Sequence, residues 1–169
     1  MRWVPFPLHP DTPADGRPLT ELFGGAVDVK AMMARLREVA GALDLPFGNR
    51  THTYNSRLAQ ELGEWADHLG RGRAFRDAVY RAYFADGRNI GRVDELLAVA
   101  AAAGLPPEGA ETVLRERAYR AAVDAHWRRA RGAGIRAVPT HRLRGRLREG
   151  FVPPPELARW VGEAVARRP

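Results

Sequence analysis

The amino-acid sequence predicts an α/β protein that is predominantly helical. Between residues 28 and 131 the apolar side chains recur every three or four positions, which is the period of amphipathic helices. In residues 2–8 and 140–151 the residue type instead alternates from one position to the next. Turn-forming residues lie beside both segments, as is typical of short strands. A length of 169 residues with 45% apolar content supports one domain with its own core, which excludes a disordered chain.

Residues 2–8 are expected to form an edge strand. Val4, Phe6 and Leu8 would lie on one face of it, because side chains alternate along a strand. Pro5 and Pro7 are two positions apart, so their missing N–H groups would point to the same edge and turn that edge to solvent. Residues 9–18 are rich in proline and are expected to form an extended loop.

Six helices are expected next, each beginning near a capping residue or proline and most ending near glycine. Asp28 is the expected cap of the first, and Asn55 or Ser56 that of the second, which Gly70 ends. The six cover residues 28–43, 56–69, 73–85, 93–103, a stretch from Pro106, and 120–131. The side chains expected to face inward include Met33, Leu36, Leu43, Leu62, Phe75, Leu96, Val113 and Val123.

The C-terminal part is predicted to contain a β-hairpin over residues 140–151, turning at Gly145, and a last helix introduced by the prolines 153–155. Pro139 directly precedes the hairpin and cannot donate a hydrogen bond to a ladder. An X-Pro bond adopts the cis form at a cost of only about 0.5–1 kcal/mol, so the sequence leaves the cis or trans state at Pro139 open.

The charge is strongly positive, with a net value of +7, and Lys30 is the only basic residue besides the arginines. Eight arginines and no acid lie between Arg128 and Arg148, a run that suits nucleic acid or phosphate. No aromatic residue follows Trp127 within that run, and the arginines accompany abundant Ala, Gly and Pro, as coding bias produces. A basic helical nucleic-acid-binding protein is therefore a further alternative that is not favoured.

The residue types needed for several enzyme classes are missing from the sequence. It contains no cysteine, so it offers no thiolate nucleophile, disulfide or cysteine metal site. Ser56, the only serine, lies in no Gly-x-Ser-x-Gly motif, and the five histidines show no metal-ligand spacing. The Gly-x-Gly pattern at residues 132–137 follows a helix and enters a strand, the reverse of a dinucleotide fingerprint. No catalytic residue and no metal ligand is predicted.

No signal pattern opens the sequence, and no apolar run approaches the roughly 18 residues of a membrane span. A cytoplasmic protein without a membrane contact is expected.

Five segments, taken in their order and spacing, resemble the DsbA-like thioredoxin-fold oxidoreductase family. The resemblance is closest to its cytoplasmic polyketide-biosynthesis-type dithiol oxidoreductases, which are relatives of the 2-hydroxychromene-2-carboxylate isomerases. The segments are residues 3–11, 55–59, 81–84 with 89–90, 103–105, and 134–140, so nearly the whole chain is covered.

The resemblance implies an incomplete thioredoxin-like fold with a large all-helical insertion. Residues 1–26 and 133–169 would form the thioredoxin-like frame, and residues 27–132 would be the insertion. The family joins a Cys-x-x-Cys on its first helix to a cis-proline before its third strand. By position, Pro139 corresponds to that proline, and Val138 and Thr140 beside it would complete a groove for an extended substrate.

The sequence departs from the family where the reaction takes place. The family's first strand and its cysteine-bearing first helix have no counterpart, and Ala137 and His141 replace a usual glycine and aromatic residue. The resemblance therefore implies a shortened gene product, with residues 2–8 in the second-strand position. We expect that strand to join a mixed sheet linking the two ends of the chain: it would pair with the hairpin, leave a slot that another chain fills, or fray.

The functional expectation is a relative of thiol–disulfide oxidoreductases that is redox-inactive as this cysteine-free chain, which leaves open whether it is an enzyme at all. The alternative is a non-catalytic module that binds a peptide or glutathione in the cis-proline groove. No cofactor other than glutathione is implied. The implied partners are a protein or small-molecule thiol or disulfide, and a second copy docked on the sheet face that the missing helix would leave uncovered.

Overall fold

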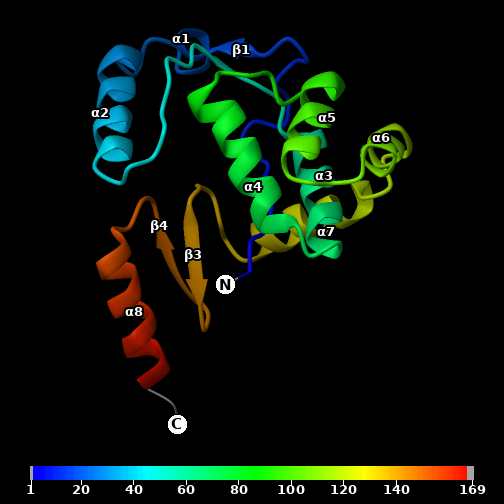
Figure 1. Cartoon of the computed structure of the whole chain (residues 1–169). Helices are drawn as coiled ribbons and strands as arrows, with labels where there is room; N and C mark the ends of the chain where they lie inside the picture. Colours follow the sequence, from blue (N-terminus) through cyan, green and yellow to red (C-terminus); the bar gives the residue numbers. More distant parts are fainter. Residues whose placement is uncertain (1, 167–169) are drawn as a thin grey trace. The chain divides into compact units, whose positions relative to one another are not determined.

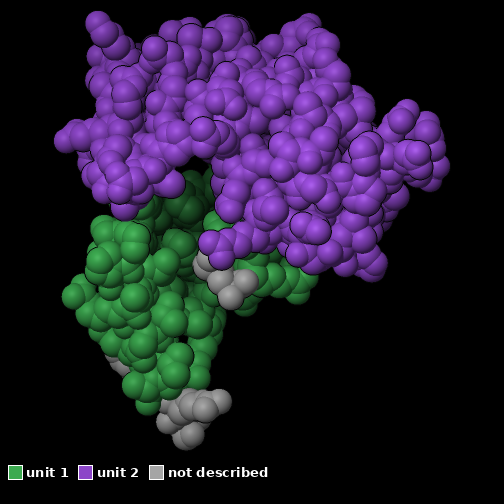
Figure 2. Space-filling view, in the orientation of Figure 1, with its two compact units in different colours: residues 1–8, 125–169 green, residues 9–124 purple. Residues whose placement is uncertain are grey.

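The computed structural model describes residues 2–166, and the chain in it is predominantly helical, as predicted (Figure 1). It divides into two compact units: residues 1–8 together with 125–169, and residues 9–124 (Figure 2). The division falls inside one helix, after Asp124. The prediction that residues 27–132 are an insertion into a thioredoxin-like frame stays a prediction.

The core of the unit formed by residues 9–124 lies between four helices. These are α3 (Arg57–His68), α4 (Gly72–Tyr80), α5 (Val93–Ala102) and α6 (Pro107–Glu116). Leu62, Leu96, Ala100 and Ala110 are completely buried between them, and Phe75 is 1% exposed. The periodic apolar positions of the sequence therefore meet in one cluster, as the helical pattern predicts. A short π-helix, η1 (Arg81–Ala85), continues α4 and carries Tyr83 and Phe84.

Helix ends follow the capping signals of the sequence, with one choice settled by the structure. Asp28 accepts a hydrogen bond from the backbone N–H of Ala31 at 3.0 Å and caps α2 (Val29–Gly41). At α3 the cap is Asn55, whose Oδ1 accepts from the N–H of Arg57 at 2.9 Å. Ser56 makes no capping bond, because its hydroxyl accepts from Gln60 instead.

The burial predicted for α2 is only partly correct. Met33 and Ala40 are buried, but Leu36 is 41% exposed and Leu43, just beyond the helix, is 37% exposed. Few residues of other helices or strands lie close to α2, and part of its apolar face stays exposed within the described residues. The apolar periodicity of the sequence predicts the helix correctly. It does not predict how much of the apolar face is buried, because burial depends on the residues that pack against the helix.

Three short elements were not predicted. Arg17–Pro18 (β1) pairs antiparallel with His52–Thr53 (β2), and the one-turn helix α1 (Leu19–Leu22) follows β1 and buries Leu19. Both strands lie in stretches expected to be loops. A two-residue strand is too short to show any alternation, so the sequence carries no signal for it.

The unit formed by residues 1–8 and 125–169 contains the end of α7 (Arg120–Gly132), β3 (Thr140–Leu143), β4 (Arg146–Glu149) and α8 (Pro154–Ala166). β3 and β4 form the predicted hairpin, with Thr140 opposite Glu149 and Leu143 opposite Arg146. Arg144 and Gly145 both have positive φ, at 49° and 81°, as a two-residue type I′ turn requires.

The predicted strand at residues 2–8 is wrong. No strand is assigned there, and Val4 and Leu8 are 41% and 49% exposed, whereas Pro7 is buried. The described residues form two two-stranded sheets only, so the expected mixed sheet between the two ends of the chain is absent from residues 2–166. Alternation marks a segment able to form a strand, but a strand exists only where a partner offers hydrogen bonds. No described helix is long and apolar enough to cross a membrane.

Candidate substrate-binding loop

The loop that leads into the hairpin begins at the end of α7. Gly134 has φ 75°, and the N–H of Ile135 donates to the carbonyl of Ala130 at 3.1 Å, which is the glycine-dependent ending typical of helices. The chain then turns away from the helix axis and reaches Ala137. The Gly-x-Gly pattern of residues 132–137 is thus a helix ending, and no helix N-terminus follows it that would face a phosphate.

Two hydrogen bonds hold residues 137–140 in place. The hydroxyl of Thr140 donates to the carbonyl of Ala137 at 2.6 Å, and the N–H of Gly150 donates to the carbonyl of Pro139 at 2.8 Å. The peptide bond between Val138 and Pro139 is cis, which the sequence left open. The structure thus brings together the three residues of the predicted site, Val138, Pro139 and Thr140, in one tight loop.

Val138 is the exposed member of this loop. Its side chain is 43% exposed, and neither its N–H nor its carbonyl takes part in a hydrogen bond within residues 2–166. β3 begins directly after Pro139 and pairs only with β4 among the described strands, so its other edge has no strand partner within residues 2–166. An exposed strand edge with unpaired backbone groups is the surface to which an extended peptide adds.

The hairpin is held against α8 by the face of β4 that Thr140 does not share. Arg148 pairs with Glu156, with 2.7 Å between Nη1 and Oε1, and its guanidinium lies 5.4 Å from the ring centroid of Trp160. Trp160 is 6% exposed and is the buried anchor of α8. Because His141 lies opposite Arg148 in the ladder, it shares this face rather than the face of Thr140.

The loop offers no thiol chemistry. Thr140 offers a hydroxyl and His141 an imidazole, but the sequence supplies no thiol that could attack a disulfide. No group of His, Cys, Asp and Glu side chains within residues 2–166 is arranged to hold a metal ion. The loop can position a backbone, but it holds no nucleophile of the kind that disulfide exchange needs.

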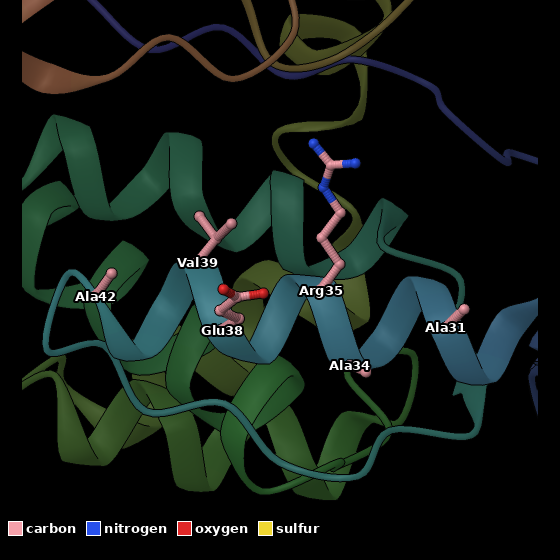
Figure 3. A pocket seen from close by; sticks show the side chains of 6 residues that line it. All are labelled: Ala31, Ala34, Arg35, Glu38, Val39 and Ala42. Carbon is pink, nitrogen blue, oxygen red and sulfur yellow. The ribbon is translucent and has the colours of Figure 1, made fainter.

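Two further candidates remain, the arginine run and a groove on α2. The arginine run covers the end of α7 and the hairpin, where Arg142, Arg144 and Arg146 are exposed at the tip. Nucleic-acid binding by that run stays a prediction. An open groove runs along α2 and is lined by Ala31, Ala34, Arg35, Glu38, Val39 and Ala42 (Figure 3). Its lining is mostly small side chains, and nothing in it marks a ligand.

One cluster escaped the sequence analysis altogether. Arg50, in the loop before β2, lies over the rings of Tyr83 and Phe84 on η1, 33 residues further along the chain. The only available signal was the aromatic pair itself, because nothing in the pattern around Arg50 indicates which helix the loop meets. This cluster belongs to the unit of residues 9–124.

Comparison with known proteins agrees with the resemblance drawn from the sequence. A family model described as a DSBA-like thioredoxin domain matches residues 1–161. The crystal structure of a probable DsbA oxidoreductase from Streptomyces coelicolor is similar to this chain, with a TM-score of 0.86 and 28% sequence identity. The similarity covers 96% of this chain and 74% of that one. No curated protein sequence matches. The chain, predominantly helical and free of cysteine, therefore belongs to the DsbA-like thioredoxin domain family.

Proposed function

We propose that this chain binds an extended polypeptide along Val138 and the open edge of β3, and that it does not itself catalyse thiol–disulfide exchange. The observation that carries the proposal is Val138, an exposed residue whose N–H and carbonyl are unpaired within residues 2–166 and which lies in a loop closed by Thr140 and Gly150. Free N–H and C=O groups on a fixed edge give affinity for a peptide backbone regardless of its sequence.

The absence of exchange follows from the chemistry of the reaction. Disulfide exchange needs a thiolate that attacks one sulfur of a disulfide, forms a mixed disulfide and expels the other sulfur as a thiolate. The hydroxyl of Thr140 and the imidazole of His141 form no such intermediate, and no cysteine exists elsewhere in the sequence. Substrate binding and exchange are therefore separable in this chain.

Exchange is tested by the reduction of insulin with dithiothreitol in the presence of the purified chain. We expect the same rate as with buffer alone, before and after treatment of the chain with N-ethylmaleimide. The treatment blocks the thiols of a contaminating oxidoreductase. A faster rate that survives it would contradict the redox part of the proposal.

Binding is tested by NMR on the ¹⁵N-labelled chain, with the insulin B chain, its cysteines S-methylated, as the probe. We expect the amide signals of Val138, Thr140 and β3 to shift most. Thr140→Val, which removes the bond to Ala137, should weaken the interaction, whereas Thr20→Val, at an exposed threonine, should not. An absence of shifts at Val138 would reject peptide binding, and shifts caused by glutathione instead of the peptide would identify a small thiol as the ligand. Homodimer formation stays a prediction.

A further inference from the structure

Arg50 lies in an unusual environment for a cation. The backbone N–H of Gly48 donates to the carbonyl of Phe84 at 2.9 Å, which holds the loop before β2 against η1. The Arg50 guanidinium is 4.5 Å from the ring centroid of Tyr83 and 5.3 Å from that of Phe84. Contact with two rings, which meet edge to face at an interplanar angle of 71°, removes part of the hydration of the guanidinium.

No carboxylate balances this charge, since Arg50 forms no ion pair with any of residues 2–166. Its Nη1 donates to the hydroxyl of Tyr83 and, at 3.4 Å, to the carbonyl of His52. Its Nε is buried and has no acceptor, and its Nη2 makes no hydrogen bond within the described residues. A buried donor without an acceptor costs on the order of 1–3 kcal/mol. The unpaired Nε therefore lowers the stability of the chain unless another molecule supplies an acceptor.

The two unused groups share one edge of the guanidinium. Nε–H and the nearer N–H of Nη2 point in parallel, which is the fork that accepts a carboxylate with two hydrogen bonds. Nη2 is not among the buried atoms without a partner, whereas Nε is, so a carboxylate would approach the fork from the Nη2 side. The opposite edge is already occupied by Tyr83 and His52 and keeps the fork in one orientation.

Further aromatic rings contact the two rings that lie beside the Arg50 guanidinium. The rings of His52 and Tyr54 stack at 6.2 Å with an interplanar angle of 8°, and Tyr54 meets Tyr83 edge to face at 6.2 Å. Tyr80, which is 47% exposed, meets Phe84 at 6.0 Å. The Tyr83 hydroxyl is held in turn by Thr53, at 3.1 Å from its Oγ1. Apolar surroundings of this kind strengthen a charge-assisted hydrogen bond and favour a ligand with a flat apolar body.

We propose that Arg50 is the anchor of a second binding site, which takes the carboxylate of an aromatic acid through Nε and Nη2. Tyr83 and Thr53 position the guanidinium, and the rings around it contact the body of the ligand. This site lies wholly within residues 9–124, and it does not depend on the peptide-binding loop at Val138.

The probe for the test is 4-fluorobenzoate, followed by ¹⁹F NMR at constant ionic strength with the full chain. We expect saturable binding that unlabelled benzoate competes for better than acetate or phosphate does. Arg50→Met should weaken binding about tenfold or more, and Arg50→Lys should weaken it as well, because an ammonium cannot form the fork. Arg50→Lys also serves if the methionine variant does not fold.

The matched control is Arg148→Met, because Arg148 also lies over an aromatic ring but is paired with Glu156. It should bind the probe like the unmodified chain. Equal losses in the Arg50 and Arg148 variants would show general attraction to a basic protein and would overturn the proposal. Tighter competition by phosphate than by benzoate would overturn it too, as would the absence of saturable binding.

Discussion

At the scale of single residues, the lack of a side chain at position 48 lets the loop before β2 lie against η1. A Cβ on Gly48 would be 2.0 Å from the carbonyl oxygen of Ala85, which is backbone and cannot rotate away. Gly63 in α3 is a natural contrast, because a Cβ there would meet the ring of Phe75 at an ordinary 3.6 Å. The backbone therefore excludes a side chain at position 48, whereas position 63 has room for one.

We expect Gly48→Ala to lower the free energy of unfolding by about 1–3 kcal/mol, since the loop must move off η1 to relieve the overlap. Gly63→Ala should instead raise it by about 0.5–1 kcal/mol, because alanine loses less entropy than glycine in a helix. Urea unfolding followed by circular dichroism measures both. A Gly48→Ala chain as stable as the original would show that the loop does not rest on η1.

Asn55 joins the segment before β1 to the start of α3. Its Nδ2 donates to the carbonyls of Pro10 and Thr12 at 3.0 and 2.9 Å, while its Oδ1 caps α3. Asn55→Asp keeps the cap but removes both donors and places a negative charge beside two carbonyls. We expect a loss of about 1–3 kcal/mol in the free energy of unfolding, measured by urea titration.

Asn49→Asp provides the control for this substitution. Asn49 is exposed and its Oδ1 only accepts, from Arg37 at 2.5 Å, so an aspartate reproduces its contact. Its effect should stay within about 0.5 kcal/mol. If both substitutions lower the free energy of unfolding equally, the hydrogen bonds from Asn55 to residues 10 and 12 do not contribute to stability.

At the scale of elements, one buried carboxylate connects α3 to the end of α6. Glu61 on α3 is 0% exposed and accepts from Nε of Arg57 at 2.7 Å. Arg117, the left-handed residue that ends α6, binds both oxygens of Glu61 at 2.7 Å. Arg57 also reaches Asp124 at 2.8 Å, which extends the network into α7.

The network decides the protonation state of Glu61. Burial by itself raises the pKa of this carboxyl, but the hydrogen bonds and charges of Arg117 and Arg57 outweigh burial and hold the pKa below the ordinary value of 4.5. A carboxyl with a lowered pKa binds fewer protons in the folded than in the unfolded chain. Its contribution to stability is therefore present above pH 4.5 and is lost as the pH falls through the lower folded value.

Glu61→Gln should lower the free energy of unfolding by about 3–5 kcal/mol at pH 7, because two arginines lose their buried counter-charge. The difference from the unmodified chain should shrink as the pH falls below 4.5, where the glutamate itself becomes neutral. Urea titrations at several pH values measure this trend. Glu111→Gln, at an exposed position, is the control, and a pH-independent difference would contradict the role of charge.

At the scale of the whole molecule, stability is distributed unevenly between α2 and the helices of the core. Each of the helices α3 to α6 buries three or four residues, whereas the 13-residue α2 buries only Met33 and Ala40. Segments with few buried contacts open at low free energy, while core helices open only when the fold does. The order of opening is therefore predictable from burial.

Hydrogen exchange followed by mass spectrometry should show peptides from α2 exchanging well before peptides from α3 and α5. The peptide covering α6 is a suitable internal reference, because α6 is one of the shortest core helices and still buries Ala110, Val113 and Leu114. Equal protection of α2 and α6 would mean that α2 is covered in solution by something outside residues 2–166.

Elements that depend on neighbouring residues were predicted correctly from the sequence, whereas those that depend on distant residues were not. The bounds of α5 and the start of α8 agree with the prediction to within one or two residues, because Gly104 follows the periodic face of α5 and the prolines 153–155 introduce α8. The hairpin was predicted from its alternation and from Gly145. The strand at residues 2–8 failed because its pattern is correct but no partner strand meets it in the described residues.

Some of the candidate binding residues were identified from the sequence, and one was found only in the structure. Val138, Pro139 and Thr140 were identified through a family resemblance, and the structure adds the cis bond and the two hydrogen bonds that close the loop. Arg50 was missed because its significance arises from Tyr83 and Phe84 on another element.

The sequence alone determined where the helices lie, because the i to i−4 hydrogen bonds and caps that form a helix involve residues close together in the chain. It also determined that no thiol is present, which is a matter of composition. Only the tertiary structure decided which backbone edges find partners, which apolar faces are covered and which cation lies without a carboxylate. Those outcomes depend on groups far apart in the chain, whose distances are set only when the chain packs.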